Sequence, residues 1–207
     1  MLKIKHISAY PDAYLSLFGN PKDGQEDTLR EFINAVERMV GPKGLKLRGQ
    51  KDKYKFKGDV LEVLAELFFT RLNSDPAFGL TEYKPTNPND DFGVDATGIN
   101  ANGHLSVVQV KYSRNPQSEI RWKDLAKTAL DGIYNFGIDG KVDRNVFLFT
   151  TAFKVNWICT KRFGNHLVII NRAIIQRTID NNRNFWKLCF ADVQEYVQYH
   201  SGCSYVI

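Results

Sequence analysis

The chain has 207 residues, of which 43% are hydrophobic and 13% aromatic, enough to bury one sizeable core. It contains no run of about 18 apolar residues, and its N-terminus lacks the long apolar stretch of a secretory signal. We therefore predict a cytoplasmic protein that does not associate with membranes. The three cysteines are widely spaced and match no zinc pattern, which indicates reduced, buried thiols rather than a disulfide-rich secreted protein.

Positive charge is concentrated in one segment. The net charge is +5, but eight basic residues and a single acid, Asp52, lie between Arg38 and Lys57. With aromatic residues interleaved, such a segment is typical of a surface that binds polyanions by neutralising phosphates. A solvated lysine-rich loop or edge strand explains the pattern equally well. The residues predicted to contact DNA are Arg48, Lys51, Lys53, Lys55, Lys57 and, further along the chain, Arg114.

Helices are predicted in the first third of the chain. Residues 1–22 are expected to be irregular and carry little functional signal. From Gln25 to Val40, apolar residues recur every three or four positions, which predicts an amphipathic helix. Gly41–Gln50 is interpreted as a basic loop, and Lys51–Lys57 as a short strand or a continuation of that loop. The next segment, Gly58–Asn73, is predicted to be the second helix.

The second helix is apolar around most of its circumference. Only a narrow stripe, which holds Asp59, Glu62 and Glu66, is acidic. Acidic side chains on an otherwise packed helix are candidates for a functional site. The alternative is a thin solvated stripe without function.

A predicted strand, His104–Tyr112, carries the clearest functional signal. Both of its faces are largely apolar, as in a strand inside a sheet that helices cover. Gln109 and Lys111 nevertheless share one face near its C-terminal end. A buried lysine has to be paired or to stand at an opening, because an isolated buried charge is costly. We therefore expect carboxylates from elsewhere in the chain beside Lys111.

A hairpin supplies one such carboxylate. Phe92–Ile99 is predicted to form a strand, and Asn100–Gly103 the turn into the following strand. Counting outward from this turn places Asp95 opposite Gln109. The Asp95 carboxylate and the Lys111 ammonium are then expected to meet.

These groups suit the hydrolysis of phosphodiester bonds. Carboxylate and amide oxygens, with the backbone carbonyl of Val110 as a further ligand, are suited to Mg²⁺ or Mn²⁺. The cation lowers the pKa of a bound water, and Lys111 orients or deprotonates that water or stabilises negative charge. Glutamine in place of an acid lowers the negative charge of the site. We therefore expect weak metal binding unless a DNA phosphate contributes.

Three short motifs occur in the order of a known family. They are G-x-x-x-E at Gly58–Glu62, GVD at Gly93–Asp95 and VQVK at Val108–Lys111. Together they resemble the PD-(D/E)xK nuclease superfamily, specifically its Mrr-type restriction endonuclease branch with a Q-x-K motif. The resemblance covers roughly residues 56–179. It implies that the metal and catalytic site consists of Glu62, Asp95, Gln109 and Lys111.

Two further acids remain alternatives within that assignment. Glu66 lies one turn after Glu62 and competes with it as the ligand from the helix, although the spacing of the motif favours Glu62. Asp91 precedes the hairpin strand and is interpreted as a loop residue that caps a turn, or as a ligand to a second metal.

The predicted fold is α/β, with a restriction-endonuclease-like core in which helices flank a central mixed sheet. Residues 1–50 are predicted to form a helical, basic N-terminal extension, and residues 51–207 the nuclease-like domain. The predicted function is a Mg²⁺-dependent endodeoxyribonuclease of the restriction type. Its expected partner is DNA, and cleavage of both strands would require two active sites and thus favour a homodimer.

Other functions remain open at the level of the sequence. A structure-specific nuclease that resolves junctions or acts in repair would use the same residues. A nuclease-like fold that only binds DNA is another alternative, although such a module has no use for an acid cluster beside a lysine. A nuclease directed at RNA would differ in its substrate preference.

Overall fold

The structure is a computed structural model, and it describes residues 2, 6–19, 28–73, 75, 77–86, 93–139, 141–142 and 144–201. The chain divides into two compact units. The first unit consists of Met1–Leu67 and Ile175–Ile207, and the second unit of Phe68–Ile174. Within the described residues, no helix combines the length and the apolar character needed to cross a membrane.

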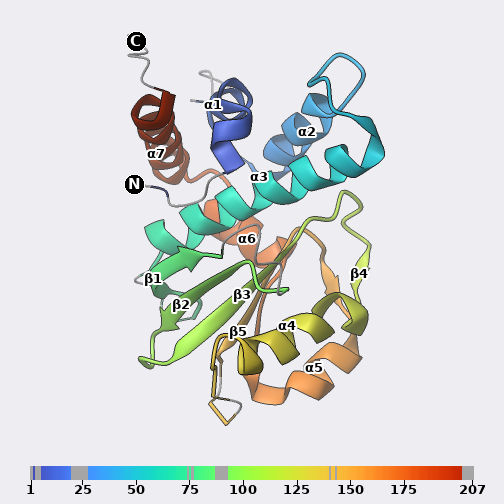
Figure 1. Cartoon of the computed structure of the whole chain (residues 1–207), viewed down its shortest axis with the longest axis vertical. Coiled ribbons are helices and arrows are strands. Elements are labelled where there is room, and N and C mark those ends of the chain that lie inside the picture. The colour runs from blue at the N-terminus through green and yellow to red at the C-terminus, as the bar shows by residue number, and fades with distance from the viewer. Residues whose placement is uncertain are drawn as a thin grey trace. The chain divides into compact units, whose positions relative to one another are not determined.

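The helices are distributed over the whole chain (Figure 1). Their bounds are η1 (His6–Ala9), α1 (Pro11–Phe18), α2 (Leu29–Met39), α3 (Gly49–Arg71), α4 (Trp122–Tyr134), α5 (Trp157–Phe163), η2 (Gly164–His166), α6 (Arg172–Ile179) and α7 (Arg183–Ser201). The strands are β1 (Leu80–Pro85), β2 (Ala96–Asn100), β3 (Leu105–Lys111), β4 (Glu119–Ile120), β5 (Val146–Thr150), β6 (Lys154–Val155) and β7 (Leu167–Ile170).

The second unit is built on a five-stranded sheet in the order β1-β2-β3-β5-β7. The pairs β1/β2 and β2/β3 are antiparallel, whereas β3/β5 and β5/β7 are parallel. The predicted α/β class with a mixed sheet is thus confirmed. The strand β3 lies in the middle of the sheet and joins its antiparallel half to its parallel half.

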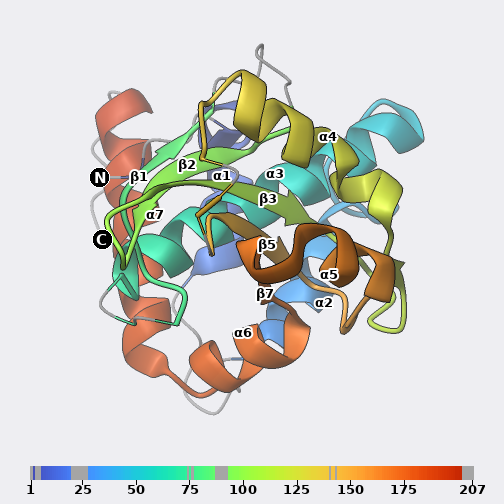
Figure 2. The ribbon, with the colours of Figure 1, turned by 90° about the horizontal axis from the view of Figure 1, so that it is seen from below.

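Apolar side chains cover both faces of the central strands, which explains why β3 and β5 are buried almost throughout. On one face, Val107 and Leu148 belong to a cluster with Leu125 of α4 and Cys159 of α5. These two helices lie next to each other against the sheet (Figure 1, Figure 2). The strand prediction for β3 is therefore confirmed, including its two apolar faces.

Aromatic rings fill the opposite face within the same unit. The ring of Phe149 lies 5.2 Å from that of Phe68 and 5.9 Å from that of Phe69. Phe69 also stacks on Tyr83 of β1 at 5.5 Å. This packing fixes the position of the central strands and so the place where β3 ends.

The first unit has a separate aromatic core. The ring of Phe32 in α2 lies 5.1 Å from Phe18 of α1 and 5.6 Å from Trp186 of α7. Thr28 caps α2 by accepting a hydrogen bond from the backbone N–H of Glu31 at 3.2 Å. The expectation that residues 1–22 are irregular is wrong, because η1 and α1 lie there.

The segment Lys51–Lys57 is neither a strand nor a loop, but part of the long helix α3. Residues four apart contact each other on its surface, as Lys55 and Asp59 do through an ion pair of 2.8 Å. Phe56 and Val60, also four apart, are both buried. The alternation of lysines and aromatics therefore lies within about two turns of a helix, and Gly58 lies inside the helix rather than at its start.

Candidate metal and catalytic site

The hairpin brings Asp95 to Gln109, as the sequence predicts. The ladder between β2 and β3 pairs Ala96 with Val108, and the backbone N–H of Asp95 donates to the Val108 carbonyl at 2.9 Å. On its other side, the Asp95 carbonyl accepts a hydrogen bond from the backbone N–H of Thr86 at 3.0 Å. The backbone of Asp95 is thus held between two neighbouring chain segments.

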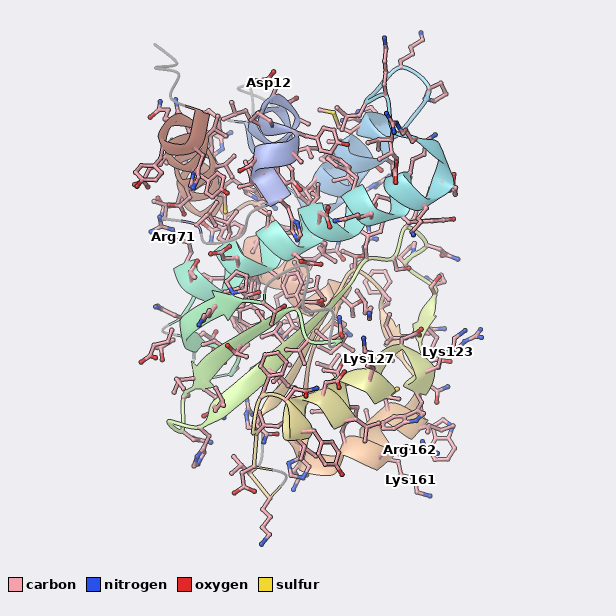
Figure 3. All side chains as sticks on the ribbon, viewed as in Figure 1. Asp12, Arg71, Lys123, Lys127, Lys161 and Arg162 are labelled. Carbon is pink, nitrogen blue, oxygen red and sulfur yellow. The ribbon has the colours of Figure 1, made fainter. Side chains whose placement is uncertain are left out.

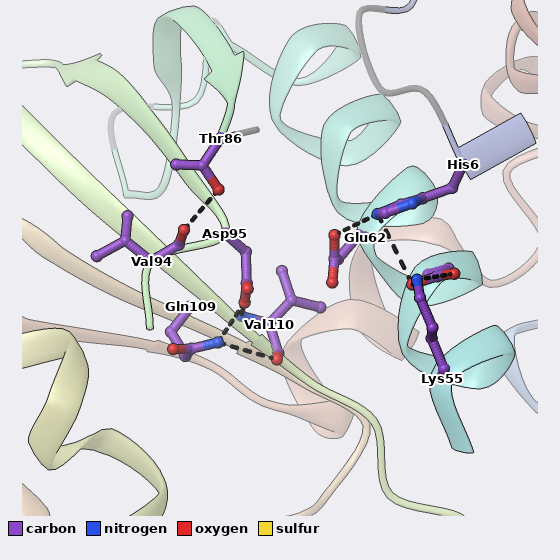
Figure 4. Close-up of polar contacts among 9 residues, drawn as sticks. His6, Lys55, Glu62, Thr86, Val94, Asp95, Gln109 and Val110 are labelled. Atoms are coloured by element: carbon purple, nitrogen blue, oxygen red, sulfur yellow. Dashed lines mark hydrogen bonds and ion pairs between the residues drawn. The ribbon is translucent and has the colours of Figure 1, made fainter. Parts of the chain in front are cut away.

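The Asp95 carboxylate lies at the end of β3 (Figure 4). Its Oδ2 accepts a hydrogen bond from the backbone N–H of Val110 at 2.6 Å and another from Nε2 of Gln109. The carbonyl oxygen of Val110 lies 3.4 Å from the same Nε2. A carboxylate, an amide and a backbone carbonyl therefore converge at one point, with the amide nitrogen facing the two oxygens. Carboxylate, amide and carbonyl oxygens are the ligands that hard divalent cations prefer, so the Gln109 amide would have to turn to become a ligand.

Gln109 is buried, with 3% of its surface exposed. Its side chain contacts Thr128, which carries no functional signal in the sequence. Oγ1 of Thr128 in α4 lies 2.6 Å from Oε1 of Gln109 and 2.7 Å from the carbonyl oxygen of Gly93. Gly93 has a φ of +71°, a left-handed backbone conformation that favours glycine. In the G-V-D motif, the glycine thus suits the left-handed backbone at position 93, and the aspartate supplies the carboxylate at the end of β3.

Lys111 is the last residue of β3 and is half-buried. It lies opposite Thr150 of the parallel strand β5, whose Oγ1 donates a hydrogen bond to the Lys111 carbonyl at 2.7 Å. Among the described residues of the second unit, no carboxylate pairs with the Lys111 ammonium, so the prediction that Asp95 and Lys111 meet is wrong. The Asp95 carboxylate instead accepts hydrogen bonds from Gln109 and Val110. The ammonium is therefore available to a ligand at the end of the sheet.

Glu62 belongs to the first unit, where it contacts His6. Nε2 of His6 lies 2.8 Å from Oε2 of Glu62 and 3.8 Å from Oδ1 of Asp59 (Figure 4). The three side chains are close enough to hold a metal ion among themselves. His6 carries no functional signal in the sequence, because no periodicity links it to residues more than fifty positions away.

The acids on α3 also affect the titration of their neighbours. Burial lowers the pKa of His6, but the hydrogen bond that its ring donates to Glu62 and the negative charges of Glu62 and Asp59 outweigh burial, so the pKa is raised. The hydroxyl of Tyr14 is buried and has no hydrogen-bond partner in the described part of the chain. Burial first, and then the charges of Asp59 and Glu62, raise the pKa of Tyr14.

The remaining predicted ligands differ in their placement. Glu66 is buried, with 2% of its surface exposed, whereas Glu62 is partly exposed. Asp91 lies outside the described residues. Since Glu62 belongs to the first unit and Asp95, Gln109 and Lys111 to the second, a cation shared by all of them stays a prediction.

The basic residues predicted to contact DNA differ in their exposure and in their ion pairs. Arg48, Lys51 and Arg114 are exposed. Lys53 is half-buried, and Lys55 pairs with Asp59 on the surface of α3. Lys57 is only 7% exposed and pairs with Glu37 at 2.8 Å, which leaves it little surface for a phosphate.

A further set of basic side chains lies on the second unit. Lys123 and Lys127 project from α4, and Lys161 and Arg162 from α5 (Figure 3). The guanidinium of Arg162 stacks over the ring of Trp122, with 4.5 Å between its central carbon and the ring centroid.

Comparison with known proteins yields no matching family model and no matching curated protein. Among solved structures, a chain in an EndoMS–dsDNA complex is similar, with 14% sequence identity and a TM-score of 0.32. The match covers 64% of this chain and 48% of that chain. So distant a likeness assigns neither fold nor function, and the nuclease resemblance of the sequence stays a prediction.

The contact between His6 and Glu62 predicts a pH-dependent stability in the absence of metal. Because folding raises the pKa of His6, the pair stabilises the protein fully below about pH 6.5, the usual imidazole value, and this contribution is lost as the pH rises through the higher folded value. We expect His6→Gln to reduce the free energy of unfolding by up to about 1 kcal/mol near pH 5.5 and by less near pH 9. Urea unfolding in EDTA measures this difference. An equal loss at both pH values would contradict the prediction, and Glu62→Gln serves as the control that removes the partner.

Proposed function

We propose that the protein is a metal-dependent endodeoxyribonuclease of the restriction type that hydrolyses DNA phosphodiester bonds. The observation that carries the proposal is the convergence of the Asp95 carboxylate, the Gln109 amide and the Val110 carbonyl at the end of β3. Lys111, one residue further, adds a positive charge beside them. Oxygen ligands for a cation, which the carboxylate, the carbonyl and a reoriented amide could supply, together with a nearby lysine suit the hydrolysis of a phosphodiester.

The proposed metal ligands are Glu62, Asp95, Gln109 and the backbone carbonyl of Val110. Bound there, Mg²⁺ or Mn²⁺ would lower the pKa of a water and neutralise phosphate charge. The ammonium of Lys111 orients the attacking water or stabilises the charge that develops on the phosphate. We prefer Glu62 to Glu66 as the helix ligand because Glu62 is partly exposed, whereas Glu66 is buried.

The fold supports this assignment of roles. The backbone of Asp95 is fixed on both sides, and Gln109 and Lys111 are consecutive residues on one face of a buried central strand. Side chains on such a strand are held in place by packing, which keeps catalytic groups in a fixed geometry. The motifs that resemble Mrr-type nucleases include these same residues.

The proposed DNA contacts are the exposed basic residues, with Arg48, Lys51 and Arg114 as the main candidates and Lys53 and Lys55 as weaker ones. Lys57 is omitted from this set because it is buried and paired with Glu37. Contacts to phosphates position a nuclease on DNA without reading its sequence. Cleavage of both strands would require two copies of the site, which favours a homodimer.

Cleavage of supercoiled plasmid tests the proposal. We expect nicking in Mg²⁺ or Mn²⁺ and none in EDTA, because the water is activated only at a bound cation. A parallel reaction on a four-way junction separates a structure-specific nuclease from one that cleaves ordinary duplex. Binding of duplex without any cleavage in either metal would contradict the proposal and indicate a DNA-binding module.

A further inference from the structure

The hydroxyl of Thr128 has two acceptors and one proton. Its Oγ1 lies 2.6 Å from Oε1 of Gln109 and 2.7 Å from the carbonyl oxygen of Gly93. Both neighbours are oxygens that only accept hydrogen bonds, so one of the two contacts is left without a proton. Thr128 is completely buried, so this competition occurs away from solvent.

The nitrogen end of the same amide faces two acceptors. Nε2 of Gln109 donates to Oδ2 of Asp95 and lies 3.4 Å from the Val110 carbonyl. In this orientation the amide turns its N–H groups toward the two oxygens with which it is proposed to bind a cation. An amide coordinates a hard cation through its oxygen, so Gln109 in this orientation cannot be a ligand beside Asp95.

A half-turn of the amide removes the competition at Thr128. Nε2 of Gln109 then donates to Oγ1 of Thr128, and the Thr128 proton goes to the Gly93 carbonyl. Every proton in this chain of contacts has one acceptor. At the other end, Oε1 of Gln109 joins Oδ2 of Asp95 and the carbonyl oxygen of Val110. Three oxygens facing one another repel unless a cation lies between them.

We propose that Thr128 is a positioning residue that accommodates the Gln109 amide in two orientations, and that a divalent cation selects the one with Oε1 toward Asp95. This inference rests on the proposed metal site and adds a residue from α4 to it. It also gives the glutamine of the Q-x-K motif a specific role. A carboxylate presents an oxygen in either orientation, whereas an amide needs a partner that both donates and accepts, as a threonine hydroxyl does.

The first test observes the amide directly. In the uniformly ¹⁵N-labelled full chain, the side-chain NH₂ signals of Gln109 are assigned by their loss in Gln109→Glu. We expect these two signals to shift on titration with Mg²⁺, because their acceptor changes from a carboxylate to a hydroxyl. If Mg²⁺ binds and the Gln109 signals stay in place, the proposal is overturned, whatever the variants do.

The second test measures Mn²⁺ affinity by calorimetry. We expect Thr128→Val to weaken binding about tenfold, the effect of one buried hydrogen bond. Thr128→Ser, which keeps the hydroxyl, should bind within about threefold of the wild type. In a Gln109→Glu background, Thr128→Val should have an effect below about threefold, because a carboxylate needs no reorientation.

The pattern of these affinities decides the outcome. An equal loss from Thr128→Val in both backgrounds would show that Thr128 acts only through packing, and the positioning role would be overturned. Unchanged affinity in all variants, with DNA cleavage intact, would also overturn it while leaving the proposed nuclease function in place. If the wild type neither binds Mn²⁺ nor cleaves DNA, both proposals fail together.

Discussion

Replacing Lys111 by alanine should abolish DNA cleavage while leaving DNA binding largely intact. Lys111 is the last residue of a buried strand and follows Gln109 and Val110, two of the residues proposed to hold the cation. Loss of a group that positions water or stabilises charge in the transition state lowers the rate by roughly 10²–10⁴-fold. The rate of plasmid nicking in Mg²⁺ measures this loss.

Two comparisons separate catalysis from binding in that experiment. Fluorescence anisotropy with duplex DNA in EDTA should show an affinity within about threefold of the wild type, since a single phosphate contact is a small part of the total. Lys141→Ala is the control, because Lys141 is an exposed lysine that lies before β5, at the opposite end of that strand from Thr150. Full nicking activity in Lys111→Ala would remove the proposed role.

Asp95→Asn should eliminate metal binding with little change in stability. The asparagine keeps the size of the side chain and an oxygen that accepts the hydrogen bond from the Val110 N–H. It removes the negative charge, which the site needs because Gln109 is neutral. We expect Mn²⁺ affinity to fall at least about 100-fold, beyond the usual effect of losing a residue that only supports a ligand.

Calorimetry with Mn²⁺ and plasmid nicking measure the effect of Asp95→Asn. Asp139→Asn removes one negative charge from an exposed loop and should leave both measurements unchanged. Thermal unfolding should differ from the wild type by less than about 1 kcal/mol. An Asp95→Asn protein that binds Mn²⁺ and cleaves normally would exclude Asp95 from the metal site.

Local patterns in the sequence are sufficient to predict the hairpin of β2 and β3. Apolar residues on both faces identified β3 as an inner strand, and the turn at Asn100–Gly103 fixed which residues pair. Because strands alternate their side chains, a register fixed at one pair fixes all others. The contact between Asp95 and Gln109 could therefore be predicted by counting residues outward from the turn.

Contacts between residues far apart in the sequence cannot be predicted from such local patterns. His6 meets Glu62 across 56 positions, and nothing in the N-terminal segment distinguishes this histidine from an exposed one. Thr128 lies inside an amphipathic helix, where a threonine has no special pattern, and its role depends on how α4 packs on β3. Such contacts are set by the tertiary packing of separate elements.

The start of α3 was mispredicted for a different reason. Lysines at alternate positions from Lys51 to Lys57 have the period of a strand, and Gly58 has a low helix propensity. The burial of apolar side chains outweighs both the alternation of the lysines and the low helix propensity of Gly58. Phe56 and Val60, four residues apart, are both buried, and the burial of these two side chains stabilises the helix by more than the roughly 1 kcal/mol that a glycine costs.

An anomalous-scattering experiment on crystals soaked with Mn²⁺ tests the metal site most directly. We expect one strong peak about 2.2 Å from Oδ2 of Asp95, with the Glu62 carboxylate, Oε1 of Gln109 and the Val110 carbonyl as its other protein ligands. A peak coordinated by His6, Asp59 and Glu62 with none at Asp95 would contradict the assignment, as would the absence of any peak beside β3.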